Sequence, residues 1–441
     1  MTESRVSRPL SAADSAWLRM EDPSNLMTVT CVMLLAGPLD LDHLCVMLTD
    51  RLLPHDRFRQ RVVERPGRIG RPHWYYDDDF HLDRHVHRTR LPDPADERVL
   101  QAFVGEVMST PLDSERPLWH LYYVENAPSG AAIVVRLHHA MGDGVALVRL
   151  LLSLTSADPE GTTPGDCPIP QGGIPVRRGL GGVVATVGGV VGALGKLAGV
   201  ALLADSPTAL KGTLGKVKQA TWSGRLSLDE VKRVGKALGG TVNDVMMSAV
   251  AGGLCRYLEG HHGVAHNLSV RAVVPVNVRR SDEPLTLGNK FGLVFLALPV
   301  GVRDRVGRLH ELRRRMEGIK QSGEAAVIYG ILRLLGLTSA AVEIAVVNIL
   351  GRNSTAVMTN VPGPREPLYL CGRRVDDLIF WVPQSGRLAL GVSILSYAGA
   401  IRIGVAADRA VIPEPGVLVA AVQAAFHELA ADADAGIPTS R

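Results

Sequence analysis

Two adjacent histidines at the end of an apolar run are the residues of this 441-residue sequence best suited to acid–base chemistry. They are His138 and His139, and Asp143 and Gly144 follow shortly after them. Histidine has an unperturbed pKa of about 6.5, so it can take up a proton near neutral pH. Neighbouring side chains of a strand point to opposite faces, so only one of the two can readily enter a given cleft. The alternative is a hydrogen-bonded histidine pair without a chemical role.

The residues around the histidines predict a loop at the edge of a sheet. An apolar run at 131–137 predicts a strand that ends at the pair, and 121–125 predicts its hairpin partner across the turn at 127–130. Residues 145–154 predict a helix directly after the motif. The histidines and the aspartate would then lie in a tight connection between a rigid strand and a helix.

Three further side chains are candidates for contact with a substrate. Trp119 ends a rigid PLW sequence and would either line an acyl channel or pack in the core. Asn243 follows a threonine that begins a helix with a T-x-x-D capping box, so its amide could face the site or serve only the helix start. Asn360 begins the tight NVPGP turn and could donate a hydrogen bond to a substrate or an oxyanion, or merely complete the turn.

The composition is that of a globular and rather apolar protein with more than one core. The sequence has 46% hydrophobic and 21% charged residues, and its length favours two domains. A net charge of +4 does not indicate nucleic-acid binding, but it is compatible with an anionic membrane or the phosphates of CoA. The five cysteines are scattered and lack metal-ligand spacing, which is typical of reduced, buried thiols in a cytosolic protein. The N-terminus has no apolar core of a signal peptide.

Composition also suggests where the chain divides. We expect an N-terminal domain at 1–156, a linker region at 157–222 and a C-terminal domain at 223–441. Within the linker region, residues 179–195 carry no charge and are rich in glycine, valine and alanine. This segment would be a linker helix packed on protein, a peripheral membrane contact or a membrane span, for which it is barely long enough.

A basic helix is predicted at 304–321. It carries six arginine or lysine side chains, namely Arg305, Arg308, Arg313, Arg314, Arg315 and Lys320. Such a face is either solvated or in contact with the phosphates of CoA or of lipid headgroups.

Together these motifs carry a family resemblance. The HHxxxDG pattern from His138 to Gly144 resembles the signature of CoA-dependent acyltransferases. More narrowly, the PLW sequence ending at Trp119, the Asn-Asp pair at Asn243 and the NVPGP sequence at Asn360 are similar to motifs of the bacterial wax ester synthase/diacylglycerol acyltransferase family.

The resemblance implies an α/β fold and a set of roles. Two chloramphenicol-acetyltransferase-like domains would enclose a tunnel, with the active site at their interface. His139 would be the general base that deprotonates an alcohol, and His138 would adjoin it. Asp143 would be structural and pair with an arginine, for which Arg279 is a candidate. The oxyanion donor would be Asn360, Asn243 or the backbone near Gly144.

The implied activity is O-acyl transfer from acyl-CoA to the hydroxyl of diacylglycerol, giving triacylglycerol, or of a long-chain alcohol, giving a wax ester. Acyl-CoA would be the co-substrate, with no further cofactor and no metal. We expect a cytoplasmic protein, with a peripheral place on the inner membrane face or on lipid inclusions as the alternative. The rival functions are a condensation-type acyltransferase for another lipid or carrier-bound acceptor, and an inactive lipid-binding or membrane-organising protein.

Overall fold

A computed structural model describes most of the chain. The described residues are 8–64, 70–161, 205–260, 268–277, 291–322, 351 and 353–436. The uncharged segment at 179–195 and Arg279 lie outside them, so the predictions made for both stay predictions.

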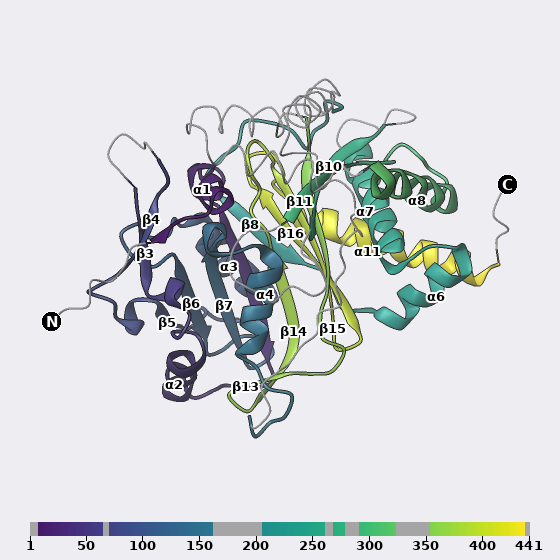
Figure 1. Cartoon of the computed structure of the whole chain (residues 1–441). Helices are drawn as coiled ribbons and strands as arrows, with labels where there is room; N and C mark the ends of the chain where they lie inside the picture. Colours follow the sequence, from purple (N-terminus) through teal and green to yellow (C-terminus); the bar gives the residue numbers. More distant parts are fainter. Residues whose placement is uncertain are drawn as a thin grey trace.

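The first sheet is built mainly from the N-terminal part of the chain (Figure 1). Its strands, in spatial order, are β13 (Tyr369–Leu370), β14 (Arg373–Trp381), β2 (Thr28–Leu35), β7 (Ala131–His138), β6 (Trp119–Val124) and β5 (Val86–Thr89). Every residue of β2 and β7 is buried, as their continuous apolar sequences predict for central strands. One face packs with α4 (Gly144–Ser153) and α2 (Leu41–Arg51), and the other with α3 (Glu97–Ser109).

The second sheet comes from the later part of the chain. Its main path is β11 (Phe291–Leu298), β10 (Val270–Asn277), β12 (Ala356–Pro362), β15 (Leu390–Tyr397), β16 (Ala400–Asp408) and β8 (Lys218–Trp222), and β9 (Leu226–Ser227) also pairs with β16. The helices beside it are α6 (Leu228–Leu238), α7 (Val242–Glu259), α8 (Arg305–Ser322) and α11 (Pro415–Asp434) (Figure 1).

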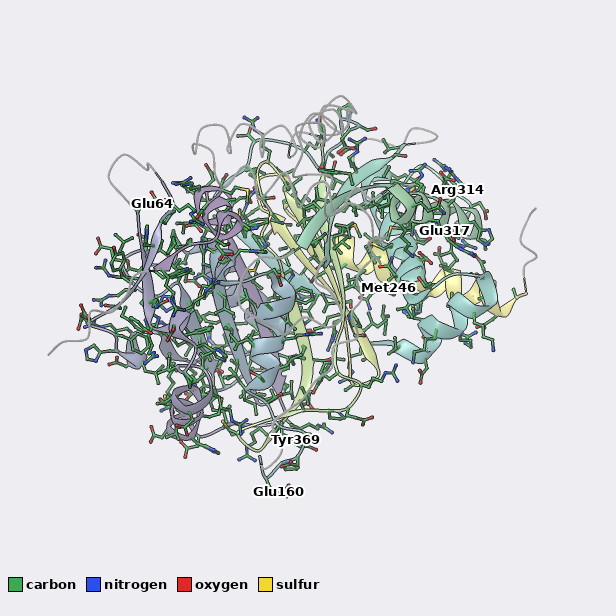
Figure 2. The ribbon with its side chains drawn as sticks, viewed as in Figure 1. Glu64, Glu160, Met246, Arg314, Glu317 and Tyr369 are labelled. Carbon is green, nitrogen blue, oxygen red and sulfur yellow. The ribbon has the colours of Figure 1, made fainter. Side chains whose placement is uncertain are left out.

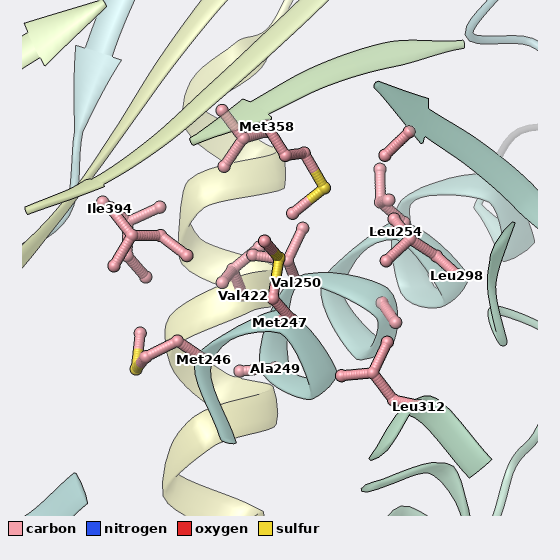
Figure 3. Packing of buried hydrophobic residues seen from close by; sticks show 14 of the residues in the cluster. Met246, Met247, Ala249, Val250, Leu254, Leu298, Leu312, Met358, Ile394 and Val422 are labelled. Atoms are coloured by element: carbon pink, nitrogen blue, oxygen red, sulfur yellow. The ribbon is translucent and has the colours of Figure 1, made fainter. Parts of the chain in front are cut away.

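Helices α7 and α11 form the core over this sheet. Val250 of α7 lies beside Val422 of α11, and Met358 and Ile394 reach this core from the sheet (Figure 3). The two helices approach closely at Gly253, where an added Cβ would lie 2.7 Å from the Cα of Val422. A larger residue at this position would force α7 and α11 apart.

Strand β14 ties the two halves together. It follows most of the second sheet in sequence, yet it pairs antiparallel with β2 of the first (Figure 1). Trp381 and Ile379 of β14 also share a buried cluster with Ala406 of β16. The strand therefore belongs to one half by sequence and to the other by pairing. The proposed domain boundaries and the tunnel between the halves stay predictions.

A small third sheet borders the first. It consists of β1 (Arg8–Pro9), β4 (His73–Tyr76) and β3 (Gln60–Val63). Helix α1 (Ala12–Arg19) follows β1, and Ser11 caps its start, because the Ser11 hydroxyl accepts a hydrogen bond from the Asp14 N–H at 3.0 Å.

Three of the six basic residues of α8 pair with acidic residues of the same helix. Arg313 pairs with Glu317 at 2.9 Å, and both Arg314 and Arg315 pair with Glu311 at 2.7 Å. Arg314 and Glu317 lie on the outer side of the helix (Figure 2). These pairs favour the solvated-face interpretation. No helix in the described part of the chain has the length and apolar character needed to cross a membrane.

Candidate active site

Strand β7 delivers the histidine pair to a short turn. His138 is the last residue of the strand, and its N–H donates to Leu118 O at 3.0 Å. His139 begins the 3₁₀ turn His139–Met141, and its N–H donates to Met27 O at 2.7 Å. Both side chains are buried. The backbone on either side of the pair is thus held by two different segments, as a precisely placed base requires.

The imidazole of His139 stacks on Trp17 of α1. The ring centroids lie 4.2 Å apart with an interplanar angle of 23°. Trp17 belongs to a buried cluster with Ala16, Met20 and Met27, and Leu293 of the second sheet packs against that cluster. The histidine ring therefore lies beside the contact of α1 with the second sheet.

Glu21, just after α1, contacts the other histidine. Its Oε2 lies 3.1 Å from His138 Nε2 and accepts the Met27 N–H at 3.0 Å. His138 Nδ1 accepts the Ala140 N–H at 3.0 Å, so the ring proton of the neutral histidine belongs on Nε2, facing Glu21. Burial raises the pKa of the Glu21 carboxyl, but the hydrogen bond and charge of His138, the Met27 N–H and the charge of Arg136 together outweigh it and hold that pKa below its usual value.

Arg57 contacts both the histidine loop and α1. Its Nη1 donates to Met141 O, and its Nη2 lies 3.2 Å from the buried Asp14 carboxylate. Its guanidinium also lies over the ring of Trp74, 5.3 Å from the ring centroid. One side chain thus connects the loop that carries His139 with the helix that carries Trp17.

Asp143 has the geometry of a helix cap. It is the N-cap residue of α4, and its Oδ1 accepts the Ala146 N–H at 2.9 Å. Only 2% of its surface is exposed. These contacts support the structural role expected for Asp143. Gly144 begins α4 directly after it.

Replacing Asp143 with alanine should lower the free energy of unfolding by about 1–2 kcal/mol, because the helix loses its cap and a buried N–H loses its acceptor. Asp143→Asn keeps an oxygen in the same place and should retain most of the stability. Chemical denaturation of both variants and the wild type measures the difference. If Asp143→Ala is as stable as the wild type but inactive, the structural role is wrong.

The two candidate asparagines lie together. Asn360 Nδ2 donates to Asn243 Oδ1 at 2.9 Å, joining the end of β12 to the first turn of α7. Asp244 completes the capping box with Thr241, so the expected helix start is confirmed. Val361, the residue after Asn360, belongs to the same buried cluster as Met141 of the histidine loop. The end of β12 therefore belongs to the same large core as that loop.

Trp119 is a core residue. Its side chain is fully buried, donates from Nε1 to Phe58 O at 3.0 Å and stacks on His85 with centroids 4.7 Å apart. The structure thus supports the packing interpretation of this tryptophan. The next residue, His120, lies with its Nδ1 2.7 Å from His87 Nε2. Burial and the charges of neighbouring histidines and Arg136 lower the pKa of His120 to about 3. His120 is therefore neutral at the near-neutral pH at which His139 would act as a base.

Sequence patterns did not point to Glu21 or Arg57. Glu21 is 117 residues from His138 along the chain and Arg57 is 84 residues from Met141, and neither belongs to a recognisable local motif. Because these contacts depend on how α1 packs on the loop, spacing along the sequence carries no signal for them.

Comparisons with known proteins point to one family. A model described as "Wax ester synthase/diacylglycerol acyltransferase catalytic domain" matches residues 10–246, more than half of the chain, and a "WS/DGAT C-terminal domain" model matches 287–430. A probable diacylglycerol O-acyltransferase of Mycobacterium tuberculosis is 29% identical over 445 aligned residues, covering 96% of each chain.

Solved structures agree on the fold. The wax ester synthase/diacylglycerol acyltransferase of Marinobacter aquaeolei superposes with a TM-score of 0.73 at 24% identity, covering 97% of this chain and all of that one. The first condensation domain of the calcium-dependent antibiotic synthetase gives a TM-score of 0.66 at 17% identity, covering 99% of this chain and 98% of that one. The predicted two-domain α/β fold is thereby confirmed.

Proposed function

Because the chain belongs to the wax ester synthase/diacylglycerol acyltransferase family and is an acyltransferase, we propose that it moves a long-chain acyl group from acyl-CoA to the hydroxyl of diacylglycerol or of a long-chain alcohol. The observation that carries this proposal is the geometry of His139. Its ring is held by Trp17 on one side and its backbone by Met27, beside the contact with the second sheet. Acceptors this apolar would be met at a membrane or lipid-inclusion surface.

In the proposed reaction His139 acts as a general base. Its Nε2 takes the hydroxyl proton while the hydroxyl oxygen attacks the thioester carbonyl carbon. The tetrahedral intermediate collapses, the carbon–sulfur bond breaks, and the CoA thiolate takes the proton from His139. The oxyanion needs a hydrogen-bond donor, and the Asn243–Asn360 pair supplies the side-chain candidate.

A covalent acyl-enzyme is not needed for this route. The buried thiol nearest in sequence to α1 is Cys31, and burial raises its pKa to about 12. Such a thiol is protonated at neutral pH and is a poor nucleophile. A covalent route through the Cys31 thiol is therefore disfavoured, and direct attack of the alcohol on the thioester needs no such intermediate.

The proposed function is tested with the purified full-length chain. Palmitoyl-CoA is supplied with dioleoylglycerol, with hexadecanol, with both, with an amine or carrier-bound acceptor, or with no acceptor, and thiol release is followed together with the acylated product. We expect release that depends on an acceptor. Release only with an amine or carrier-bound acceptor would favour a condensation-type enzyme. No release with any acceptor would favour a lipid-binding protein.

Glu21 is a positioning residue in this scheme, because it acts on the loop through His138. We expect Glu21→Gln to lower kcat about tenfold. It should also shift the acidic limb of the pH–rate profile to lower pH, because the negative charge that favours the protonated form of the histidine pair is lost. Glu115→Gln, at an exposed position, is the matched control. A Glu21→Gln profile that overlays the wild type at full kcat would refute the role.

A further inference from the structure

A cavity lies beside the histidine loop. Its volume is about 660 Å³, and its walls come from the β1 strand, the 54–57 turn, β3, β4 and α4. Neither His139 nor the asparagine pair lines it. Arg57, which donates to Met141 O, and Ala146, whose N–H is capped by Asp143, are shared between the cavity wall and the loop structure. The cavity therefore adjoins the catalytic loop without being the place of reaction.

The charge of the cavity wall favours an anion. Arg8, Arg57 and Arg149 line it, against a single acidic lining residue, Asp56, and Arg57 is also paired with Asp14 at 3.2 Å. The Asp56 carboxylate is already engaged, because it accepts the Tyr76 hydroxyl at 2.6 Å and lies 3.4 Å from Arg59. Arg8 is exposed and has no acidic partner among the described residues. Guanidinium groups in this arrangement suit phosphate better than a neutral ligand.

Two buried side chains in the same wall hold unused hydrogen-bonding groups. Gln60 is only 5% exposed, and its amide makes no hydrogen bond with any residue the structure describes. Trp74 is 3% exposed, and within the described chain its Nε1–H likewise lacks an acceptor. The Trp74 Nε1–H is enclosed by protein, whereas Gln60 lines the cavity and its amide can donate to a group that enters it. A phosphate oxygen is such an acceptor.

We propose that this cavity binds a phosphate-bearing group next to the catalytic loop. Its size falls in the usual range for small-ligand sites, and Pro9, Pro54 and Leu150 add apolar surface for the rest of the ligand. The phosphate has two sources: the nucleotide end of CoA, which rests on the proposed function, or the headgroup of a phospholipid. Either ligand would place its charged end against Arg8 and Gln60.

Two binding measurements on the full-length chain separate the sources. The first is calorimetric titration with 3′,5′-ADP, the nucleotide end of CoA. The second is co-flotation with phosphatidylcholine vesicles that contain or lack phosphatidylglycerol. The variant is Arg8→Ala/Gln60→Leu. Arg61→Ala is the control, because Arg61 is the next residue of β3 but does not line the cavity.

We expect the double variant to weaken binding of one probe at least tenfold, while Arg61→Ala binds as the wild type does. If the double variant loses 3′,5′-ADP binding and has a raised KM for acyl-CoA, the phosphate that the cavity binds belongs to CoA. If the double variant instead loses phosphatidylglycerol-dependent flotation, the phosphate belongs to a phospholipid headgroup.

If neither probe binds the wild type, or if both bind the double variant unchanged, the proposal is overturned. Circular dichroism establishes that the double variant is folded. The proposed function fails separately: phosphate binding at Arg8 with no acyl transfer in the thiol-release assay would refute the acyltransfer scheme and leave the cavity site standing.

Discussion

Replacing His139 with alanine will lower kcat by about 10² to 10⁴, the range expected when a positioned base is removed. Without the imidazole, no side chain in the loop takes its place. His138 is engaged by Ala140 N–H at Nδ1 and by Glu21 at Nε2. Asp143 is occupied as the cap of α4. The remaining rate would come only from substrate binding and oxyanion stabilisation.

The measurement is thiol release under saturating palmitoyl-CoA and acceptor. His139→Gln is the second variant, because it keeps a planar polar group against Trp17 and separates loss of the base from loss of packing. His43→Ala, at an exposed position on α2, is the control. Near-normal turnover in a folded His139→Ala protein would remove the proposed role of this residue.

Replacing Asn243 with leucine will lower kcat by about 10² to 10³, the usual cost of losing one oxyanion donor. The hydrogen bond from Asn360 Nδ2 occupies the oxygen of Asn243, so the Asn243 amide nitrogen remains to donate. No described residue accepts from that nitrogen. Val361, next to Asn360, and Met141 of the histidine loop belong to one large buried cluster, so the end of β12 and the loop share a core.

Asn360 would then orient Asn243 instead of contacting the oxyanion itself. Asn360→Leu should therefore cost less, about tenfold, since Asn243 keeps its donor but loses its support. The KM for acyl-CoA should change little in either variant, because the interaction forms only in the transition state. Equal kinetics of Asn243→Leu and wild type, or a larger loss in Asn360→Leu, would contradict this order.

Most secondary structure could be predicted because its signals are local. Ser11, Asp40, Asp96 and Thr241 each cap a helix that begins at the next residue, through a hydrogen bond to an N–H two or three positions on. The loop after β7 was predictable for the same reason. An apolar run ends at His138, and an aspartate that caps α4 follows. Such contacts involve residues a few positions apart, so spacing alone encodes them.

The contacts between segments that are distant in sequence could not be predicted from any local pattern. Trp119 ends a motif that is compatible with both a channel wall and a core position. Only its contacts with Phe58 and His85 show that it packs in the core. Strand β14 has the apolar sequence of any buried strand, and only its pairing with β2 places it in the first sheet.

The same division applies to the site itself. The sequence alone determined the residue types and the strand-turn-helix that present His139, because these follow from periodicity and capping. Only the tertiary structure brought Trp17 to its ring, Glu21 to His138 and Asn243 to Asn360. Those contacts follow from how whole helices and sheets bury their apolar faces against one another, a choice to which residues along the entire chain contribute.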